Sequence, residues 1–165
     1  EVGVADGDVA DTYADLVGRA RRYQPDATIL GVHVQEMVDL DDGVETIVGV
    51  NRDPQFGPLI LFGLGGIFVE IVEDTTCRVA PVSAPEAAAM TREIDAAPLL
   101  RGARGRDPID VGGVIETIQR LSQLVTDFPA ILELDITPLV ATPDGVAAVD
   151  VRLTVDPEQL RGAHR

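Results

Sequence analysis

The sequence predicts an α+β fold built in layers around a largely antiparallel sheet. Three observations predict it. Several short segments alternate apolar and polar residues with the two-residue period of a strand, clusters of Gly, Pro and Asp separate them, and longer segments repeat apolar residues every three or four positions. Strands in hairpins with interspersed helices pack as such layers.

Three segments have the period of a helix, namely residues 8–23, 84–94 and 111–126. The first has acidic residues early and arginines late, as the helix dipole favours, and Pro25 follows its end. The second begins with Pro85 near its first turn, where proline is well tolerated. Between the second and third helices we expect an irregular connection rich in Gly, Pro and Arg.

The remaining apolar segments predict strands. They are residues 28–38, 45–51, 58–62, 67–72, 78–82, 130–141 and 146–155. A turn cluster at residues 39–43 favours a hairpin between the first two strands, and a turn at residues 142–145 joins the last two. The fold is therefore expected to end in a long hairpin.

Composition excludes several classes of protein. The chain has 165 residues, a length that fits one domain or two small lobes, and a single cysteine, which excludes a disulfide framework or a Cys-rich zinc site. No apolar run approaches the roughly 18 residues of a membrane helix, and no signal pattern is visible at the start. The net charge of −15 repels phosphate backbones and anionic lipids, so we expect neither nucleic-acid nor membrane binding.

The charged residues are unusually distributed. The sequence has no lysine, so all 13 basic residues are arginine, and Asp outnumbers Glu among the 28 acids. High net charge maintains solubility at the expense of self-repulsion, a combination associated with halophiles. We interpret the chain as cytoplasmic and adapted to high salt; an ordinary acidic domain is the alternative.

The last hairpin brings polar side chains to one face. If the apolar residues of both strands face the core, a two-residue loop at Pro143-Asp144 pairs Thr137 with Asp150, Asp135 with Arg152 and Glu133 with Thr154. A three-residue loop with a left-handed Gly145 would shift this register by one. We prefer the first register because the shift would bury charges.

This polar face has two interpretations. A face with three carboxylates, a hydroxyl and one arginine can hold Mg²⁺, which takes oxygen ligands together with substrate phosphates. The alternative is simply the wet side of an antiparallel sheet. The pattern alone leaves both open.

Six motifs appear in order along the chain. They are VQEM (34–37), VETIVGV (44–50), RDPQFGP (52–58), FGLGGIFVE (62–70), RVAP (78–81) and ELDITPL (133–139). Together they resemble the ATP-grasp region of ADP-forming (NDP-forming) acyl-CoA synthetases, relatives of the succinyl-CoA synthetase β subunit. The resemblance covers residues 2–155. It implies the C-terminal lobe of an ATP-grasp fold, with helices packed on one face of the sheet.

The resemblance also implies a function. The family interconverts an acyl-CoA, ADP and phosphate with a carboxylate, CoA and ATP, through an acyl phosphate and a phosphohistidine. The chain is accordingly expected to be part of an acid–thiol ligase, with ATP or ADP and Mg²⁺ as cofactors.

Residues for the nucleotide follow from the resemblance. Gln35, Glu36 and Met37 correspond to the hinge between lobes, whose backbone meets adenine. Glu45 is expected to contact ribose or orient the hinge, unless it is a solvated strand acid. Arg78 either steadies phosphate charge or pairs with a neighbouring acid.

The metal and catalytic positions are also implied. Thr137 and Asp150 correspond to the two Mg²⁺ ligands, although the family usually has Asn in place of Thr137. Asp135 corresponds to an acid that positions the histidine loop. Gly65 and Gly66 bring backbone N–H groups towards phosphate or that loop, or else form a tight turn.

Essential parts of the family's enzymes are not in this sequence. The first nucleotide-binding lobe, with its lysine, and the CoA-binding domains or α subunit are expected to come from elsewhere, so that residues 1–165 form a partial ATP-grasp domain, inactive alone. The alternatives are a non-catalytic ATP-grasp remnant, a regulatory or partner-binding module, or a segment fused to an acetyltransferase domain.

Overall fold

A computed structural model describes residues 1–38, 43–66 and 74–162. The chain divides into two compact units, Glu1–Val38 and Asp39–Arg165, which are described separately. Most of the predicted turn at 39–43 and the whole predicted strand at 67–72 lie outside the described residues. In the described part, no helix has the length and apolar character to cross a membrane.

The first unit is a helix followed by an extended segment. A short 3₁₀ turn, η1 (Asp6–Asp8), leads into α1 (Val9–Tyr23), as predicted. Residues 27–38 contain no strand, so the strand predicted at 28–38 is wrong. Leu30 is 96% exposed and Val34 74% exposed. Alternation of apolar and polar residues reports an extended backbone, but only a hydrogen-bonded partner makes it a strand.

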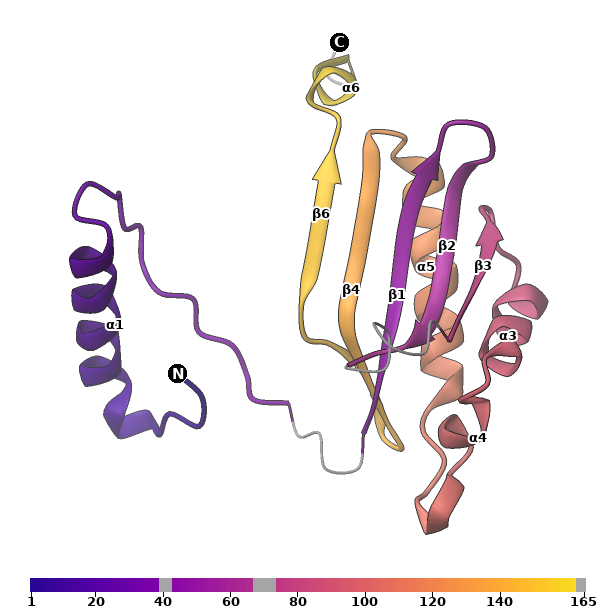
Figure 1. The fold of residues 1–165 in the computed structure, drawn as a ribbon, viewed down its shortest axis with the longest axis horizontal. Helices are drawn as coiled ribbons and strands as arrows, with labels where there is room; N and C mark the ends of the chain where they lie inside the picture. The colour runs from indigo at the N-terminus through magenta and orange to yellow at the C-terminus, as the bar shows by residue number, and fades with distance from the viewer. Residues whose placement is uncertain (39–42, 67–73, 163–165) are drawn as a thin grey trace. The chain divides into compact units, whose positions relative to one another are not determined.

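In its described residues the second unit is built on a six-stranded sheet whose strand pairs are all antiparallel, which agrees with the predicted largely antiparallel sheet (Figure 1). The strand order is β3-β2-β1-β4-β5, and β6 also pairs with β4. The strands are β1 (Val44–Asp53), β2 (Gly57–Leu64), β3 (Thr75–Val79), β4 (Ile131–Thr142), β5 (Gly145–Ala148) and β6 (Val151–Val155).

Strand β1 occupies the middle of the sheet. It forms a hairpin with β2, and the Asp53 carboxylate fixes the turn by accepting bonds from the N–H groups of Gln55 (2.7 Å) and Phe56 (2.9 Å). Its other edge pairs with β4. Both edges are therefore occupied, and the predicted hairpin between residues 28–38 and 45–51 is wrong.

The helices of the second unit match two of the predictions. They are α3 (Ala84–Glu93), α4 (Ala97–Leu100), α5 (Val111–Asp127) and α6 (Pro157–Gly162). A capping box of Ser83 and Glu86 starts α3, and the Asp110 carboxylate accepts from the N–H of Gly113 (2.9 Å) at the start of α5. The connection expected to be irregular contains α4 and a 3₁₀ turn, η2 (Ala103–Gly105).

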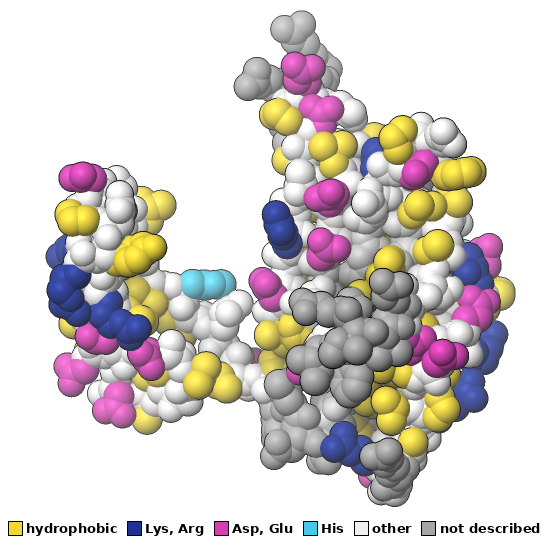
Figure 2. All heavy atoms as spheres, in the orientation of Figure 1, with side chains coloured by type: hydrophobic (Ala, Val, Ile, Leu, Met, Phe, Trp, Pro, Cys, Tyr) yellow, Lys and Arg dark blue, Asp and Glu magenta, His cyan; other side chains and the backbone are white. Residues whose placement is uncertain are grey.

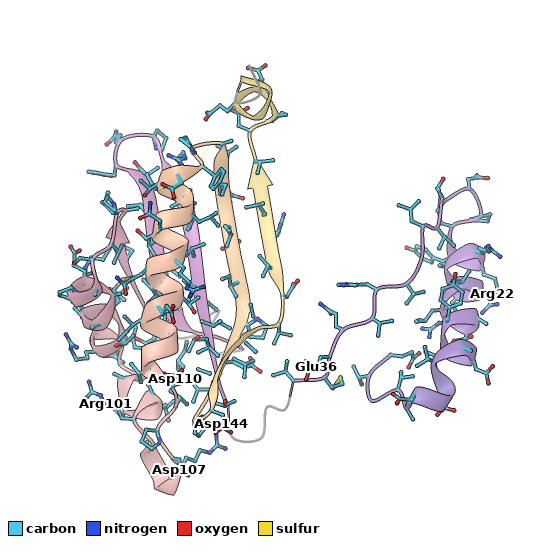
Figure 3. All side chains as sticks on the ribbon, turned by 180° about the vertical axis from the view of Figure 1, so that it is seen from behind. Arg22, Glu36, Arg101, Asp107, Asp110 and Asp144 are labelled. Atoms are coloured by element: carbon cyan, nitrogen blue, oxygen red, sulfur yellow. The ribbon has the colours of Figure 1, made fainter. Side chains whose placement is uncertain are left out.

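The core lies between the helices and one face of the sheet. Helix α5 packs on β1, β2 and β4, while α3 packs on β2 and β3 (Figure 3). Helices on one face are what was expected. The largest fully buried side chains include Phe62, Ile60, Met90, Leu100 and Ile118.

Two strand predictions need correction. The strand expected at 78–82 is β3, which begins three residues earlier, and the chain leaves the sheet at residue 80. The strand expected at 146–155 is divided into β5 and β6. Val151 and Leu153 are 53% and 51% exposed rather than core residues, because β6 is an edge strand and α5 lies across the inner strands.

The burial along α5 makes a testable prediction. Leu121 is 4% exposed and Leu124, on the same helix, is 37% exposed. Leu121→Ala should lower the free energy of unfolding by about 2–5 kcal/mol, because it leaves a cavity in the core. Leu124→Ala, the matched control, should cost less than about 1 kcal/mol. Denaturant unfolding measures both, and equal losses would contradict the described packing.

Candidate functional site

The last hairpin has the register that its hydrophobic pattern predicted. Glu133 pairs with Thr154 and Asp135 with Arg152, and the N–H of Thr137 donates to the carbonyl of Asp150 (3.0 Å). Ile136 packs against the core, while its neighbours Asp135 and Thr137 are exposed. The polar residues of β4 and β6 therefore share the face opposite the helices, which we call the open face.

The turn of this hairpin settles the alternative register. Thr142 pairs with Gly145, so that Pro143 and Asp144 form a two-residue loop. The three-residue loop, which would have shifted the strands by one, is wrong. The same register continues from β5 into β6, although the strand assignment is interrupted at residues 149–150.

Strand β1 adds a third residue to the row of Asp135 and Arg152 on the open face. Gly49 lies opposite Asp135 on the side away from Arg152. A Cβ placed on Gly49 would lie 2.9 Å from the Oδ1 of Asp135. The Asp135 carboxylate thus leans over β1 and occupies the space that any side chain at position 49 would take.

The glycine-rich segment at the end of β2 packs against Glu45. The N–H of Gly65 donates to the carbonyl of Glu45 (2.7 Å). Gly66 has a φ of +68°, and a Cβ there would lie 2.9 Å from Glu45 Oε2. Gly66 therefore suits glycine for two reasons, its left-handed backbone and the adjacent carboxylate. Glu45, Gly65 and Gly66 form one cluster.

Acidic groups gather over β4 and β6 on the open face (Figure 2). Glu133, Asp135 and Asp150 are all exposed there. Within the described ranges, no three carboxylate, imidazole or thiol groups converge into a metal cage. Thr137 and Asp150 offer a hydroxyl and one carboxylate, a set that suits a cation sharing its coordination with phosphates and water.

Arg78 lies on the other face of the sheet. Its guanidinium donates to the Glu93 carboxylate of α3 at 2.6 Å. The hydrogen bond from Arg78, with a smaller contribution from Thr76, lowers the pKa of the Glu93 carboxyl, and the same bond raises the pKa of Arg78. Of the two expectations for Arg78, pairing with an acid is therefore correct.

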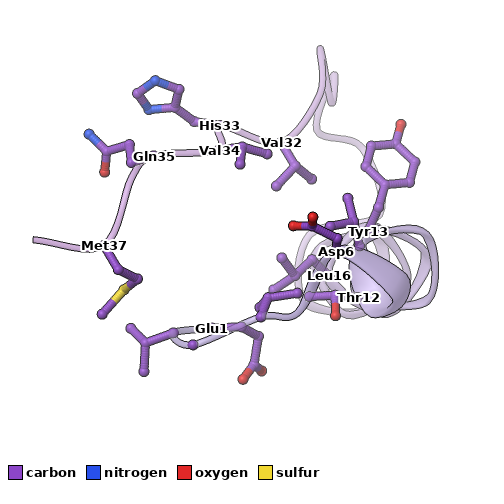
Figure 4. A pocket seen from close by; sticks show the side chains of 14 residues that line it. Glu1, Asp6, Thr12, Tyr13, Leu16, Val32, His33, Val34, Gln35 and Met37 are labelled. Carbon is purple, nitrogen blue, oxygen red and sulfur yellow. The ribbon is translucent and has the colours of Figure 1, made fainter.

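The residues expected at the hinge belong to the first unit. Gln35 and Met37 line a cavity of about 450 Å³ that is bounded by α1 and the first residues of the chain (Figure 4). Tyr13 and Leu16 of α1 form part of its wall. Glu36 is exposed in the same extended segment.

Residues 2–155 match the model of the ATP-grasp domain family. The chain belongs to this family. It is 44% identical over 148 residues to the β subunit of acetate–CoA ligase (ADP-forming) I of Pyrococcus furiosus, and 40% identical over 158 residues to the corresponding ligase I of Archaeoglobus fulgidus. These alignments cover 90% and 96% of the chain, but only 63% and 23% of the two relatives.

Solved structures also resemble this chain. One structure of the dinucleotide-forming acetyl-coenzyme A synthetase 1 of Ca. Korarchaeum cryptofilum matches with a TM-score of 0.89 and 38% identity over 94% of this chain and 69% of that one. A second structure of that protein, with coenzyme A and Mg-AMPPCP and its phosphohistidine segment pointing towards the nucleotide site, gives a TM-score of 0.67 and 42% identity over 69% of this chain and 54% of that one.

Sequence reasoning on this ATP-grasp chain missed Gly49. Its position beside Asp135 depends on the pairing of β1 with β4, whose paired residues are more than 80 positions apart in the sequence. A glycine in the middle of a strand does signal close approach of another group. That signal does not name the group.

The contact with Gly49 predicts what a methyl group would do. Gly49→Ala should move the Asp135 side chain to another χ1 rotamer, because Cβ and Oδ1 cannot remain 2.9 Å apart. The carboxylate can rotate into open space, so the free energy of unfolding should change by less than about 1 kcal/mol. Three-bond NMR couplings at Asp135 report the rotamer.

The matched control is Asn51→Ala, on the same strand and face and opposite Glu133. It should leave the Asp135 couplings unchanged. Unchanged couplings in Gly49→Ala would contradict the described position of the carboxylate.

Proposed function

We propose that this chain supplies the metal- and phosphate-binding side of the nucleotide site in an ADP-forming acyl-CoA synthetase. The observation that carries the proposal is the register of the last hairpin, which brings Asp135, Thr137 and Asp150 to one face. Family membership supports it, since relatives with 44% and 40% identity are ADP-forming acetate–CoA ligases.

Thr137 and Asp150 would hold Mg²⁺. Their donor set suits a hard cation, because Mg²⁺ binds one or two protein oxygens and completes its coordination with water and substrate phosphates. The bound ion supplies charge neutralisation to the phosphates. Thr137 and Asp150 would orient those phosphates on the open face by holding the ion to which the phosphates bind.

Asp135 would position the partner of the phosphoryl group. Its carboxylate lies over Gly49 and is exposed, so it can accept a hydrogen bond from an approaching group without competing for the cation. An imidazole N–H of a histidine loop is the donor that the family resemblance suggests. In the Korarchaeum enzyme a phosphohistidine segment does point towards the nucleotide site.

The cluster of Glu45, Gly65 and Gly66 would border the nucleotide on its other side. Gln35, Glu36 and Met37 would meet adenine through their backbone. The first nucleotide-binding lobe and the CoA-binding parts would come from other sequence or a partner subunit, because the chain spans only 63% of its Pyrococcus relative. Phosphoryl transfer relies on groups held from both sides.

A second candidate is an ATP-grasp module that binds a partner or nucleotide without catalysis. Thr137 favours it, since a hydroxyl reaches less far than the amide usual in the family. The two candidates differ in one observable. The catalytic proposal requires nucleotide affinity that depends on Mg²⁺, whereas the module does not.

Asp150 provides the test. In the complete enzyme, Asp150→Asn should weaken Mg-ADP binding several-fold or more, because one carboxylate ligand is lost. Thr137→Val, which removes only the hydroxyl, should also weaken it. Calorimetric titration with and without Mg²⁺ measures both effects.

Asp144→Asn is the matched control, since Asp144 lies in the turn of the same hairpin (Figure 3). It should bind like the wild type. If the wild type binds ADP equally well with and without Mg²⁺, or if Asp150→Asn leaves the Mg²⁺ dependence of binding unchanged, the metal assignment is wrong and the second candidate is favoured.

We further propose that the protein works at high salt. Acids outnumber arginines by 28 to 13, and only a few of the described acids pair with arginine, as Glu1, Asp15, Glu93 and Glu116 do. The remaining carboxylates repel one another through solvent. Dissolved ions screen that repulsion.

Raising KCl from about 0.1 M to about 1 M shortens the screening length from about 10 Å to about 3 Å. The melting temperature should therefore rise by several degrees over this range. Thermal unfolding followed by circular dichroism measures the shift, with sucrose of equal osmolality as the control for general solute exclusion. A melting temperature that is flat in KCl, or that rises equally in sucrose, would contradict salt adaptation.

A further inference from the structure

Arg152 stands in a row of three residues that crosses the open face. The strand register sets Gly49, Asp135 and Arg152 side by side on β1, β4 and β6. Side chains opposed in this way have Cβ atoms about 4.5–5.5 Å apart. An aspartate and an arginine at that spacing would ordinarily be expected to pair.

The Asp135 carboxylate instead leans the other way. Its Oδ1 occupies the space above Gly49, on the side of β4 away from β6. Within the described part of the chain the ion pairs involve Arg19, Arg78 and Arg120, and Arg152 is in none of them. The Arg152 side chain is exposed, and its guanidinium is open to a ligand.

The other arginines of the described strands are committed to the helix side. Arg52 donates to the carbonyls of Ile131 (3.1 Å) and Val125 (3.2 Å), and Arg78 pairs with Glu93. Arg152 is therefore the cationic side chain that the described strands present on the open face. It lies among Glu133, Asp135 and Asp150, which make this face negative.

The order of groups along the strands gives Arg152 a place relative to the phosphates. Glu45 and the two glycines lie at one end, followed by the row of Thr137 and Asp150, and then the row of Asp135 and Arg152. Asp150 and Arg152 are two residues apart, about 6.6 Å along the strand. A polyphosphate that starts near Glu45 and crosses the Thr137–Asp150 row would end at Asp135 and Arg152.

We propose that Arg152 binds the terminal phosphoryl group of the nucleoside triphosphate by donating two parallel N–H···O hydrogen bonds to its oxygens. This inference rests on the proposed function. A guanidinium matches phosphate geometry in this bidentate way. It also offsets the repulsion between the triphosphate and the carboxylates of the open face.

The test compares a triphosphate with a diphosphate in the complete enzyme. Isothermal titration calorimetry with Mg²⁺ measures binding of AMPPCP, which has the terminal phosphoryl group, and of ADP, which lacks it. Arg152→Gln should weaken AMPPCP about tenfold or more and ADP less than twofold. Arg152→Lys keeps the positive charge but cannot donate two parallel hydrogen bonds, so it should lose less affinity for AMPPCP and none for ADP.

Arg92→Gln is the matched control, since it removes one exposed positive charge on α3 and should change neither affinity. Unfolding midpoints of all variants establish that the fold is intact. If Arg152→Gln loses affinity equally for AMPPCP and ADP, or loses none, the inference is overturned. The proposed function would still stand in that case, provided that the wild type binds nucleotide in a Mg²⁺-dependent way. A wild type that binds neither nucleotide would overturn both.

Discussion

The antiparallel pairing of β4 with β5 and β6 is the constraint on which the open face depends. A single register runs from the turn at Pro143 and Asp144 through Thr137 and Asp150 to Glu133 and Thr154. Because side chains alternate between faces, a shift of one residue would exchange Asp135 and Thr137 for Leu134 and Ile136. Burial of Leu134 in the hydrophobic core therefore fixes the polar residues on the other side.

The local sequence pattern was sufficient to predict an element where the segment that it pairs with is close in sequence. The helices α1, α3 and α5 and the final hairpin follow from periodicity, capping residues and a short turn. The strand expected at residues 28–38 fails because alternation does not specify a partner, and β1 already has two. Val151 and Leu153 alternate like core residues, yet they lie on an edge strand that no pattern distinguishes from an inner one.

In the candidate site too, contacts between residues close in sequence could be predicted and contacts between distant strands could not. Asp135, Thr137 and Asp150 can be brought together from the hairpin alone, since their separation in the chain is short. The contact of Asp135 with Gly49 and of Glu45 with Gly66 depends on how distant strands meet, which a single sequence does not contain. Their roles came from resemblance to the ATP-grasp family rather than from pattern, because a wet sheet face has the same alternation.

The central claim is that a metal–nucleotide complex binds between Thr137 and Asp150. The most direct measurement is a crystal structure of the complete enzyme with Mn²⁺ and AMPPCP, in which anomalous scattering locates the ion. We predict an anomalous peak within coordination distance of the Asp150 carboxylate, with the terminal phosphate on the side of Asp135. A peak elsewhere, or a nucleotide bound away from the open face, would contradict this account.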